Sequence, residues 1–315
     1  MNAKSTYPYF MRTIPSDEAA AVAVVDLLIS FGFTRCTVVH VVDDYGSGYA
    51  TAVADACQSN GLVCESIGFE TRNQASIATA VDLVAASPTR IIFGIVYDED
   101  LEPLLYSALA RNLTSNSFKY GDDDARRSDD DDRALDPRST DDIGGSSSTS
   151  SSSSGGAFWV FSDSISAATV TGLSGDAREA VAGGARVYAT GAGMDDPVDT
   201  RFKRAYVEPR ADEYNVALEP AEPHALVTDA ELALGKTYDV SNYAYDAVAA
   251  IGLAACSIAA AGGDALSGEA LLEALYATHF RGTSGHVVFD GASGSRNATS
   301  ANYVVENFRR GAADD

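Results

Sequence analysis

Apolar runs typical of strands alternate with helical segments along the first third of the chain, and this alternation constrains the fold more than any other feature. The run at 37–42 predicts a buried strand, 63–69 a second strand, and the β-branched, apolar run at 90–96 a third. Segments with helical periodicity lie around and between them, at 18–30, 49–60, 76–86 and 100–111. Strands joined through helices pair in parallel and bury both faces of their sheet, so the sequence predicts an α/β fold.

The second half of the chain continues this pattern after a long interruption. Residues 115–156 are rich in aspartate and serine, a composition that predicts a disordered insertion. Residues 208–234 are polar and contain proline, which predicts a long surface connection. Further strands are expected at 158–161, 185–190, 285–290 and 302–307, and further helices at 174–181, 199–206, 242–261 and 269–278.

The acidic balance of the chain excludes some classes of partner. A net charge of −23 over 315 residues repels phosphate backbones, so no nucleic-acid partner is expected, and a polybasic membrane contact is also disfavoured. The same charge favours cationic or zwitterionic ligands. No signal peptide is visible at the N-terminus, and the apolar stretch at 247–261 is too short to span a bilayer, so it predicts a buried helix.

Motifs that carry catalysis are missing from the sequence. It contains no nucleophile elbow, no H-E-x-x-H and no P-loop, and its four histidines are scattered. The segment 188–193 resembles a dinucleotide loop but lacks the third glycine and lies too late in the chain. The sequence therefore predicts neither an enzyme nor a cofactor or metal site.

The cysteines and two sequons give weaker signals. Cys57 and Cys64 are close enough to form a disulfide across the turn at Asn60–Gly61, and reduced core cysteines are the alternative. Asn112 and Asn297 each begin an N-x-[ST] triplet, which predicts glycosylation on a secretory route, although such triplets also arise by chance.

Five blocks of the sequence resemble one family. These blocks are residues 7–46, 100–114, 158–163, 243–248 and 280–296. They resemble the receptor-family ligand-binding region of class C G-protein-coupled receptors and receptor guanylyl cyclases, which is related to bacterial leucine-binding proteins. The block at 7–46 resembles the centre of that region, the block at 100–114 is similar to a helix of calcium-sensing and glutamate receptors, and the last two blocks are similar to metabotropic GABA receptors. The resemblance implies a two-lobed, periplasmic-binding-protein-like (type I) α/β fold with parallel sheets.

The position of the first block bears on domain organisation. In the family the strand that resembles Tyr7–Phe10 lies about a third of the way into the module, so the resemblance implies that the N-terminal part of lobe one is missing here. We expect a remnant strand and first crossover at 1–13, lobe two at 14–182, partial lobe one at 183–297 and a return strand at 298–310. The partial lobe should leave apolar faces exposed.

The function implied by the resemblance is that of the extracellular ligand-binding region of a membrane receptor. Such a region binds an amino-acid-like small molecule between two lobes and signals by closure, usually as a homo- or heterodimer, to a transmembrane module that would lie in the missing flanks. A soluble periplasmic-type amino-acid-binding protein and a non-functional receptor fragment are the alternatives. An NAD-linked oxidoreductase would need the glycine fingerprint that is absent.

The resemblance also assigns candidate ligand-binding residues. Asp17 matches an acid that helps to hold an ammonium group, and Tyr45 matches a tyrosine whose ring covers that group. Asp163 matches an acidic cleft residue of calcium-sensing receptors, and Ser162 beside it is a weaker candidate. Each has a structural alternative: Ser16 or Asp17 as a helix N-cap, Tyr45 as a turn residue packed on the next helix, and Asp163 as the N-cap of a short helix at 164–168.

Overall fold

Two compact units make up the chain. The structure is a computed structural model that describes residues 4–115, 156–190, 196–207, 228 and 238–309. Unit 1 comprises residues 1–32 and 187–305, and unit 2 comprises residues 33–186 and 306–315. Nearly all of the expected insertion at 115–156 and of the polar connection at 208–234 lies outside the described residues.

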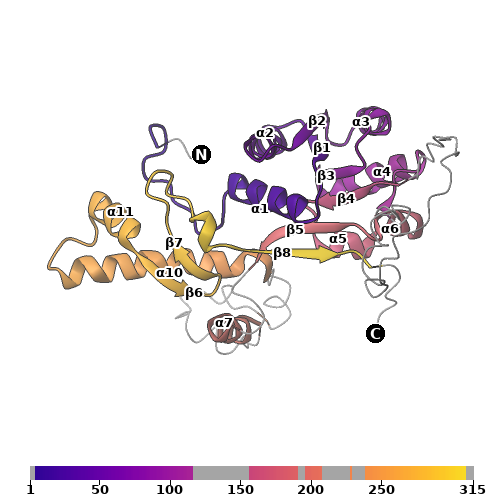
Figure 1. The fold of residues 1–315 in the computed structure, drawn as a ribbon. Helices are drawn as coiled ribbons and strands as arrows, with labels where there is room; N and C mark the ends of the chain where they lie inside the picture. The colour runs from indigo at the N-terminus through magenta and orange to yellow at the C-terminus, as the bar shows by residue number, and fades with distance from the viewer. Residues whose placement is uncertain (1–3, 116–155, 191–195, 208–227, 229–237, 310–315) are drawn as a thin grey trace, which may run out of the picture. The chain divides into compact units, whose positions relative to one another are not determined.

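A six-stranded sheet organises unit 2, with strand order β2-β1-β3-β4-β5-β8 (Figure 1). Its strands are β1 (Arg35–Val41), β2 (Val63–Phe69), β3 (Ile91–Ile95), β4 (Phe158–Phe161), β5 (Ala185–Thr190) and β8 (Asn302–Asn307). The pairs β1–β2, β1–β3, β3–β4 and β4–β5 are parallel. The predicted α/β fold with a parallel sheet is confirmed.

Helices cover both faces of this sheet. They are α2 (Asp44–Ser59), α3 (Gln74–Ala86), α4 (Asp98–Leu109), α5 (Ala167–Gly172) and α6 (Gly175–Val181). The connection from β1 to β2 through α2 runs towards one edge of the sheet. The connections through α3, from β2 to β3, and through α4, from β3 to β4, run towards the other edge. Right-handed crossovers therefore place α2 on one face and α3 and α4 on the other (Figure 1).

The core of unit 2 is apolar on both faces. On the α3–α4 face, Trp159 and Phe161 stack with their ring centroids 5.6 Å apart, and the Trp159 Nε1 donates to the carbonyl of Leu113 at 2.7 Å. On the α2 face, Tyr49 packs edge-on against Phe93 at 5.6 Å. Because successive strand residues point to opposite faces, these apolar runs serve two cores at once.

Unit 1 contains mainly helices and one hairpin. Its elements are α1 (Asp17–Ser30), α7 (Pro197–Val207), α10 (Tyr238–Ala260), α11 (Gly268–Ala277), the antiparallel strands β6 (His279–Gly282) and β7 (Gly285–Val288), and the short helix η3 (Ala298–Ser300). Strand β6 was not predicted. The hairpin packs on α10, where Ala250, Val287 and Phe289 form a small apolar cluster.

A buried polar network joins the hairpin of unit 1 to α10. The Asp246 carboxylate is fully buried and accepts bonds from the backbone N–H groups of Thr283 at 2.7 Å and Ser284 at 2.8 Å. It also accepts from both of their hydroxyls. Arg296, 2 % exposed, donates to the Ser284 hydroxyl at 2.6 Å and to four backbone carbonyls nearby. Burial lowers the pKa of Arg296, opposed by nearby acidic groups that include Asp246.

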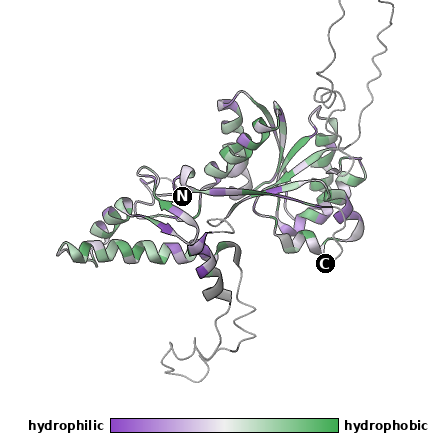
Figure 2. Cartoon of the chain, turned by 60° about the horizontal axis from the view of Figure 1, so that its bottom comes forward, coloured by the Kyte–Doolittle hydropathy of each residue, from purple (hydrophilic) through white to green (hydrophobic). Residues whose placement is uncertain are grey.

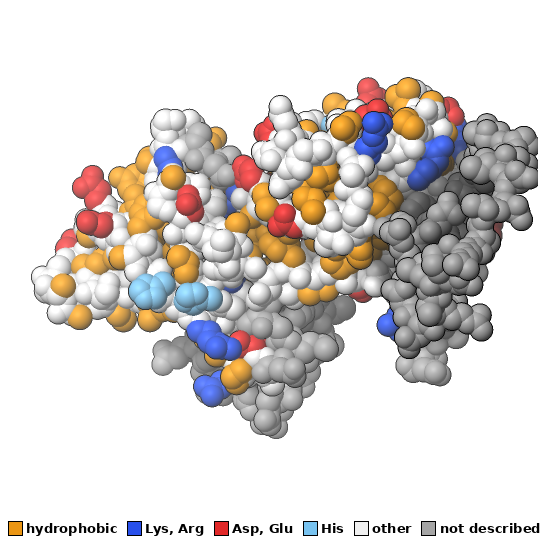
Figure 3. All heavy atoms as spheres, in the orientation of Figure 1, with side chains coloured by type: hydrophobic (Ala, Val, Ile, Leu, Met, Phe, Trp, Pro, Cys, Tyr) orange, Lys and Arg blue, Asp and Glu red, His pale blue; other side chains and the backbone are white. Residues whose placement is uncertain are grey.

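Helix α10 differs from its prediction. It has 23 residues, and its part from Val240 to Ala260 is long and apolar enough, by length and composition, to cross a membrane. Its side chains are largely exposed rather than buried, with Val248 at 72 % and Ile251 at 49 %. Figure 2 shows its hydrophobic colouring, and Figure 3 shows hydrophobic side chains on the surface of this region. The predicted helix at 242–261 is present, but the prediction that its apolar stretch at 247–261 is buried is wrong.

The division into units differs from the predicted domain boundaries at α1. The sequence predicts that 14–182 form one lobe, whereas α1 groups with unit 1 in the structure. The other divisions fall within two strands, after Arg186 in β5 and after Val305 in β8.

Candidate functional site

The carboxyl end of the unit 2 sheet contains a topological switch point. Strands β1 and β3 are neighbours, but the connection after β1 leads to one side of the sheet and the connection after β3 to the other. In open α/β sheets, ligands bind outside the carboxyl ends of the strands at such a point. The loops that follow β1, β3 and β4 are therefore the first place to look for a ligand site.

Three tyrosines meet at this point. The rings of Tyr45, from the start of α2, and Tyr97, which follows β3, are stacked with centroids 6.0 Å apart and an interplanar angle of 23°. Tyr49, one turn further along α2, meets Tyr45 edge-on at 6.1 Å. Tyr45 and Tyr97 are both half-buried, so part of each side chain remains accessible to solvent.

Asp43 fixes the geometry of this aromatic group. Its Oδ1 accepts from the N–H of Gly46 at 2.7 Å and caps α2, while its Oδ2 accepts from the Tyr97 hydroxyl at 2.6 Å. A Cβ at Gly46 would collide with the carbonyl of Val41, so only glycine permits this close turn from β1 into α2. The hydrogen bond to Asp43, with some desolvation, raises the pKa of Tyr97 to about 12, which keeps its hydroxyl protonated.

The loop after β4 adds a carboxylate. Asp163 is exposed, and its Oδ1 lies 3.4 Å from the hydroxyl of Tyr45, a long hydrogen bond. Ser162 is fully buried, with its hydroxyl 2.6 Å from that of Ser164, which in turn donates to the carbonyl of Val96. Ser162 thus holds the loop in place, and Asp163 is the group that the loop presents to solvent.

The arrangement suits a small cation. An aromatic face attracts a cation by about 0.5–2 kcal/mol, depending on how far the cation is desolvated. A carboxylate beside that face adds a charge-assisted hydrogen bond to an ammonium group. Tyr45 and Asp163, two of the candidates from the sequence, are brought together from sequence positions 118 residues apart.

Asp17 belongs to α1 in unit 1. Ser16 is the N-cap of that helix, its hydroxyl accepting from the N–H of Ala19 at 3.3 Å, so Asp17 occupies the first helical turn instead. Burial raises the pKa of the half-buried Asp17 carboxyl, opposed by the charge of Arg12. A role for Asp17 in binding stays a prediction.

The structure also bears on the structural roles that the sequence offered for Asp163 and Tyr45. Asp163 does not cap α5, because Ser166 does so by accepting from the N–H of Thr169. Tyr45 does pack on its own helix through Tyr49, but it also reaches the loops after β3 and β4. Sequence reasoning missed Asp43 and Tyr97, although both directly follow predicted strands and a search of all strand ends would have included them.

The structure shows where the two possible glycosylation sites and the cysteines lie. Asn112 is exposed with a φ of 55°, whereas Thr114 of the same triplet is buried. The Asn297 side chain caps η3, accepting from the N–H and the hydroxyl of Thr299. Cys57 and Cys64 are in disulfide-bonding position, and Cys36 lies beside them. Glycosylation stays a prediction.

The family of the chain follows from a comparison of its sequence with family profiles. The profile described as "Receptor family ligand binding region" matches residues 1–310. The chain belongs to this family. Membership agrees with the mostly parallel α/β sheet and with a candidate site at the carboxyl ends of its strands.

Curated relatives of the chain are named as receptors or receptor-like proteins. Metabotropic glutamate receptor-like protein E of Dictyostelium discoideum is 30 % identical over 95 residues, which is 30 % of this chain and 10 % of that protein. The extracellular calcium-sensing receptor of Mus musculus is 25 % identical over 113 residues, 35 % of this chain and 10 % of the receptor. The probable metabotropic glutamate receptor mgl-1 of Caenorhabditis elegans is 28 % identical over 127 residues, 37 % and 12 % respectively. Each match spans about a tenth of the relative's length.

Proposed function

We propose that this family member is the extracellular ligand-binding region of a membrane receptor and that it binds a small molecule carrying an ammonium group, such as an amino acid. The observation that carries the proposal is the contact of Tyr45 with both Tyr97 and Asp163 at the switch point of the unit 2 sheet. The names of the curated relatives, glutamate and calcium-sensing receptors, support a small charged ligand.

Each side chain of the site has a distinct part in this proposal. The ring of Tyr45 covers the ammonium group, and Asp163 accepts a hydrogen bond from it. Asp43 and Tyr97 position the ring of Tyr45, and Ser162 positions the loop that carries Asp163. Asp17 is a further candidate carboxylate for the ammonium group, on the basis of the sequence resemblance alone. The acidic charge of the chain, −23, raises the local concentration of such a ligand.

Signalling in this proposal is a shift between open and closed states. A ligand can favour closure only by its higher affinity for the closed state, and that difference is what reaches an attached transmembrane module. The receptor would act as a homo- or heterodimer on the extracellular side of the membrane.

The test is calorimetric titration of the chain with a panel of amino acids and their N-acetyl derivatives. Acetylation removes the ammonium charge, so we expect binding of a free amino acid and none of its acetylated form. Tyr45→Ala should weaken binding by about 2- to 30-fold, which corresponds to loss of the ring–cation attraction. Tyr45→Phe, which keeps the ring, should retain most of the affinity.

The controls separate the site from general charge effects. Asp163→Asn should weaken binding by about tenfold, whereas Asp55→Asn, which neutralises an exposed carboxylate on the same helix as Tyr45, should leave it unchanged. Binding that is equally strong for the acetylated ligand, or that is indifferent to both Tyr45→Ala and Asp163→Asn, would contradict the proposed site.

A further inference from the structure

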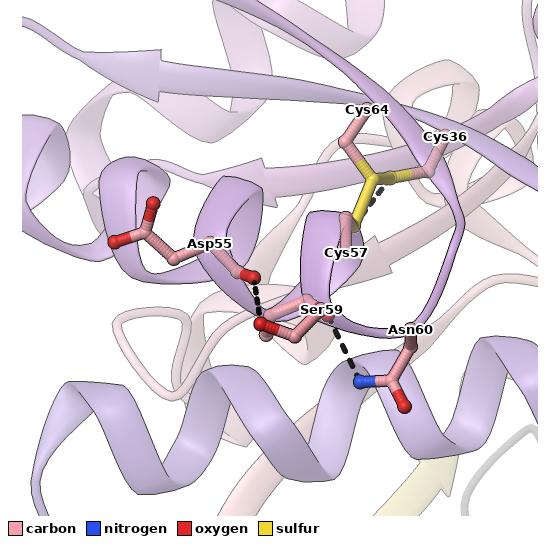
Figure 4. Close-up of a disulfide and its surroundings, with 7 residues drawn as sticks. Cys36, Asp55, Cys57, Ser59, Asn60 and Cys64 are labelled. Carbon is pink, nitrogen blue, oxygen red and sulfur yellow. Dashed lines mark hydrogen bonds between the residues drawn. A yellow bond between two sulfur atoms is a disulfide. The ribbon is translucent and has the colours of Figure 1, made fainter.

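Three cysteines of unit 2 cluster at the opposite end of α2 from the candidate ligand site (Figure 4). Cys36 lies at the start of β1 and Cys64 at the start of β2, where the parallel register pairs them directly. Cys57 lies in the last turn of α2. The three sulfur atoms all lie within 4.8 Å of one another.

Cys64 has two partners in bonding position. Its Cα lies 4.8 Å from the Cα of Cys36 and 6.3 Å from the Cα of Cys57. Both distances fall in the range of about 4.4–6.8 Å that a disulfide requires. Because one sulfur atom forms only one disulfide, the two bonds are alternatives, and each leaves one thiol directly beside the bond.

The surroundings favour a disulfide over a metal ion. Cys36 and Cys57 are 0 % and 1 % exposed, and burying them as thiolates would cost more than burying a neutral disulfide and a neutral thiol. No fourth histidine, cysteine or carboxylate joins the three among the described residues, whereas structural zinc sites use four ligands.

We propose that the cluster is an exchangeable disulfide in which Cys64 alternates between Cys57 and Cys36. The Cys36 thiol loses its proton and its thiolate attacks the sulfur of Cys64. A Cys36–Cys64 bond forms while the Cys57–Cys64 bond breaks, and the Cys57 thiolate that leaves takes up the proton. The exchange is internal, needs no oxidant, and its sulfur atoms already lie close together, with those of Cys36 and Cys57 3.9 Å apart.

Folding changes the balance between the two bonds. The sequence separation is 7 residues for Cys57–Cys64 and 28 for Cys36–Cys64, a fourfold difference. In the unfolded chain, loop closure therefore favours the shorter loop by about eightfold. The paired register of β1 and β2 removes that advantage, because it holds Cys36 and Cys64 together in the folded sheet. The ratio of the two bonds thus reports whether these strands are paired, and it is independent of the proposed ligand site.

The test maps the disulfides of the full chain carrying Cys256→Ser, which removes the exposed free thiol. Samples are quenched in acid, where exchange stops, then digested with pepsin and analysed by mass spectrometry without reduction. In urea at about pH 8, where thiolates form, we expect Cys57–Cys64 to exceed Cys36–Cys64 by about eightfold. After refolding at about pH 4 the ratio should stay at that value, and raising the pH to about 8 should then shift it towards Cys36–Cys64.

Two matched variants each allow only one of the two disulfides. Cys36→Ser should form only Cys57–Cys64 and Cys57→Ser only Cys36–Cys64, and both should fold, as circular dichroism would show. A folded wild-type ratio that does not move at the higher pH would overturn the proposal. So would three free thiols accompanied by one equivalent of zinc or copper in elemental analysis.

Discussion

Unit 2 buries a continuous apolar core between a sheet and its helices, with the Asp100 carboxylate buried as well, whereas unit 1 joins its hairpin to α10 through a buried carboxylate and guanidinium. In unit 2, side chains such as Trp159, Phe161 and Leu104 pack against one another over several elements. In unit 1, the hairpin is held on α10 by Asp246 and Arg296, beside an apolar cluster of only a few residues.

The difference teaches how each unit should respond to change. Hydrophobic burial is non-directional and spread over many contacts, so the loss of one side chain costs its own area plus the cavity that it leaves. A buried polar network is directional, and removing one member leaves the others buried without partners. We expect the loss of stability in unit 2 to follow the volume of the side chain removed, and the loss in unit 1 to follow the number of hydrogen bonds left without a partner.

The largest effect should come from the core of unit 2. Trp159→Ala should lower the free energy of unfolding of unit 2 by about 4–5 kcal/mol, because it creates a large cavity and leaves the Leu113 carbonyl without its donor. Trp159→Phe fills most of the space and should cost much less. Hydrogen exchange measured by mass spectrometry would check this, and equal loss of protection in both units would contradict separate cores.

The second-largest loss of stability should come from a substitution that breaks the polar network of unit 1. Asp246→Asn keeps the size of the side chain but turns an amide N–H₂ towards two donor groups, so we expect a loss of about 3 kcal/mol. Hydrogen exchange should rise in the hairpin and α10 and stay unchanged in unit 2. Asp264→Asn, at an exposed carboxylate of unit 1, is the control and should change stability by about 0.5 kcal/mol or less.

The two units also differ in how far the sequence predicted them. The strands of unit 2 were predicted to within two residues at either end, because most of them are short apolar runs between helices of clear periodicity. In unit 1, β6 was missed, since its segment His279–Gly282 has no apolar alternation. Helix α10 was predicted to begin at 242 rather than at Tyr238, and its apolar stretch was predicted to be buried. Burial of a helix depends on what packs against it, which its own residues do not specify.

The candidate site shows the same limit. Tyr45 and Asp163 were identified through resemblance, and their contact depends on the β1-β3-β4 strand order, which no local pattern determines. Cys36 was not paired with Cys64 for the same reason: their proximity is set by the register of two strands 28 residues apart. Spacing along the chain favoured only the nearer pair, Cys57 and Cys64.

A smaller loss of stability is expected at the candidate ligand site of unit 2. Tyr97→Phe removes the bond to the Asp43 carboxylate and should cost unit 2 about 1.5 kcal/mol, more than Tyr106→Phe, whose hydroxyl meets the neutral Ser174. Because folding raises the pKa of Tyr97 from about 10 to about 12, this stability is present below pH 10 and is lost as the pH rises through 12. Absorbance at alkaline pH should show one late-ionising tyrosine that Tyr97→Phe removes, and an unchanged titration would contradict the bond.

The smallest effects test whether the units respond separately at all, through two matched pairs of glycines. Gly61 after α2 and Gly262 after α10 have φ of +73° and +75°, so alanine there should cost about 1 kcal/mol. Gly48 and Gly252 lie inside the same helices with open space around them, so alanine should stabilise by about 0.5–1 kcal/mol. Since all four substitutions add the same methyl group, their signs isolate backbone conformation. Substitutions in or just after α2 should change hydrogen exchange only in unit 2, and those in or just after α10 only in unit 1. Changes in both units would mean that the chain unfolds as one cooperative body.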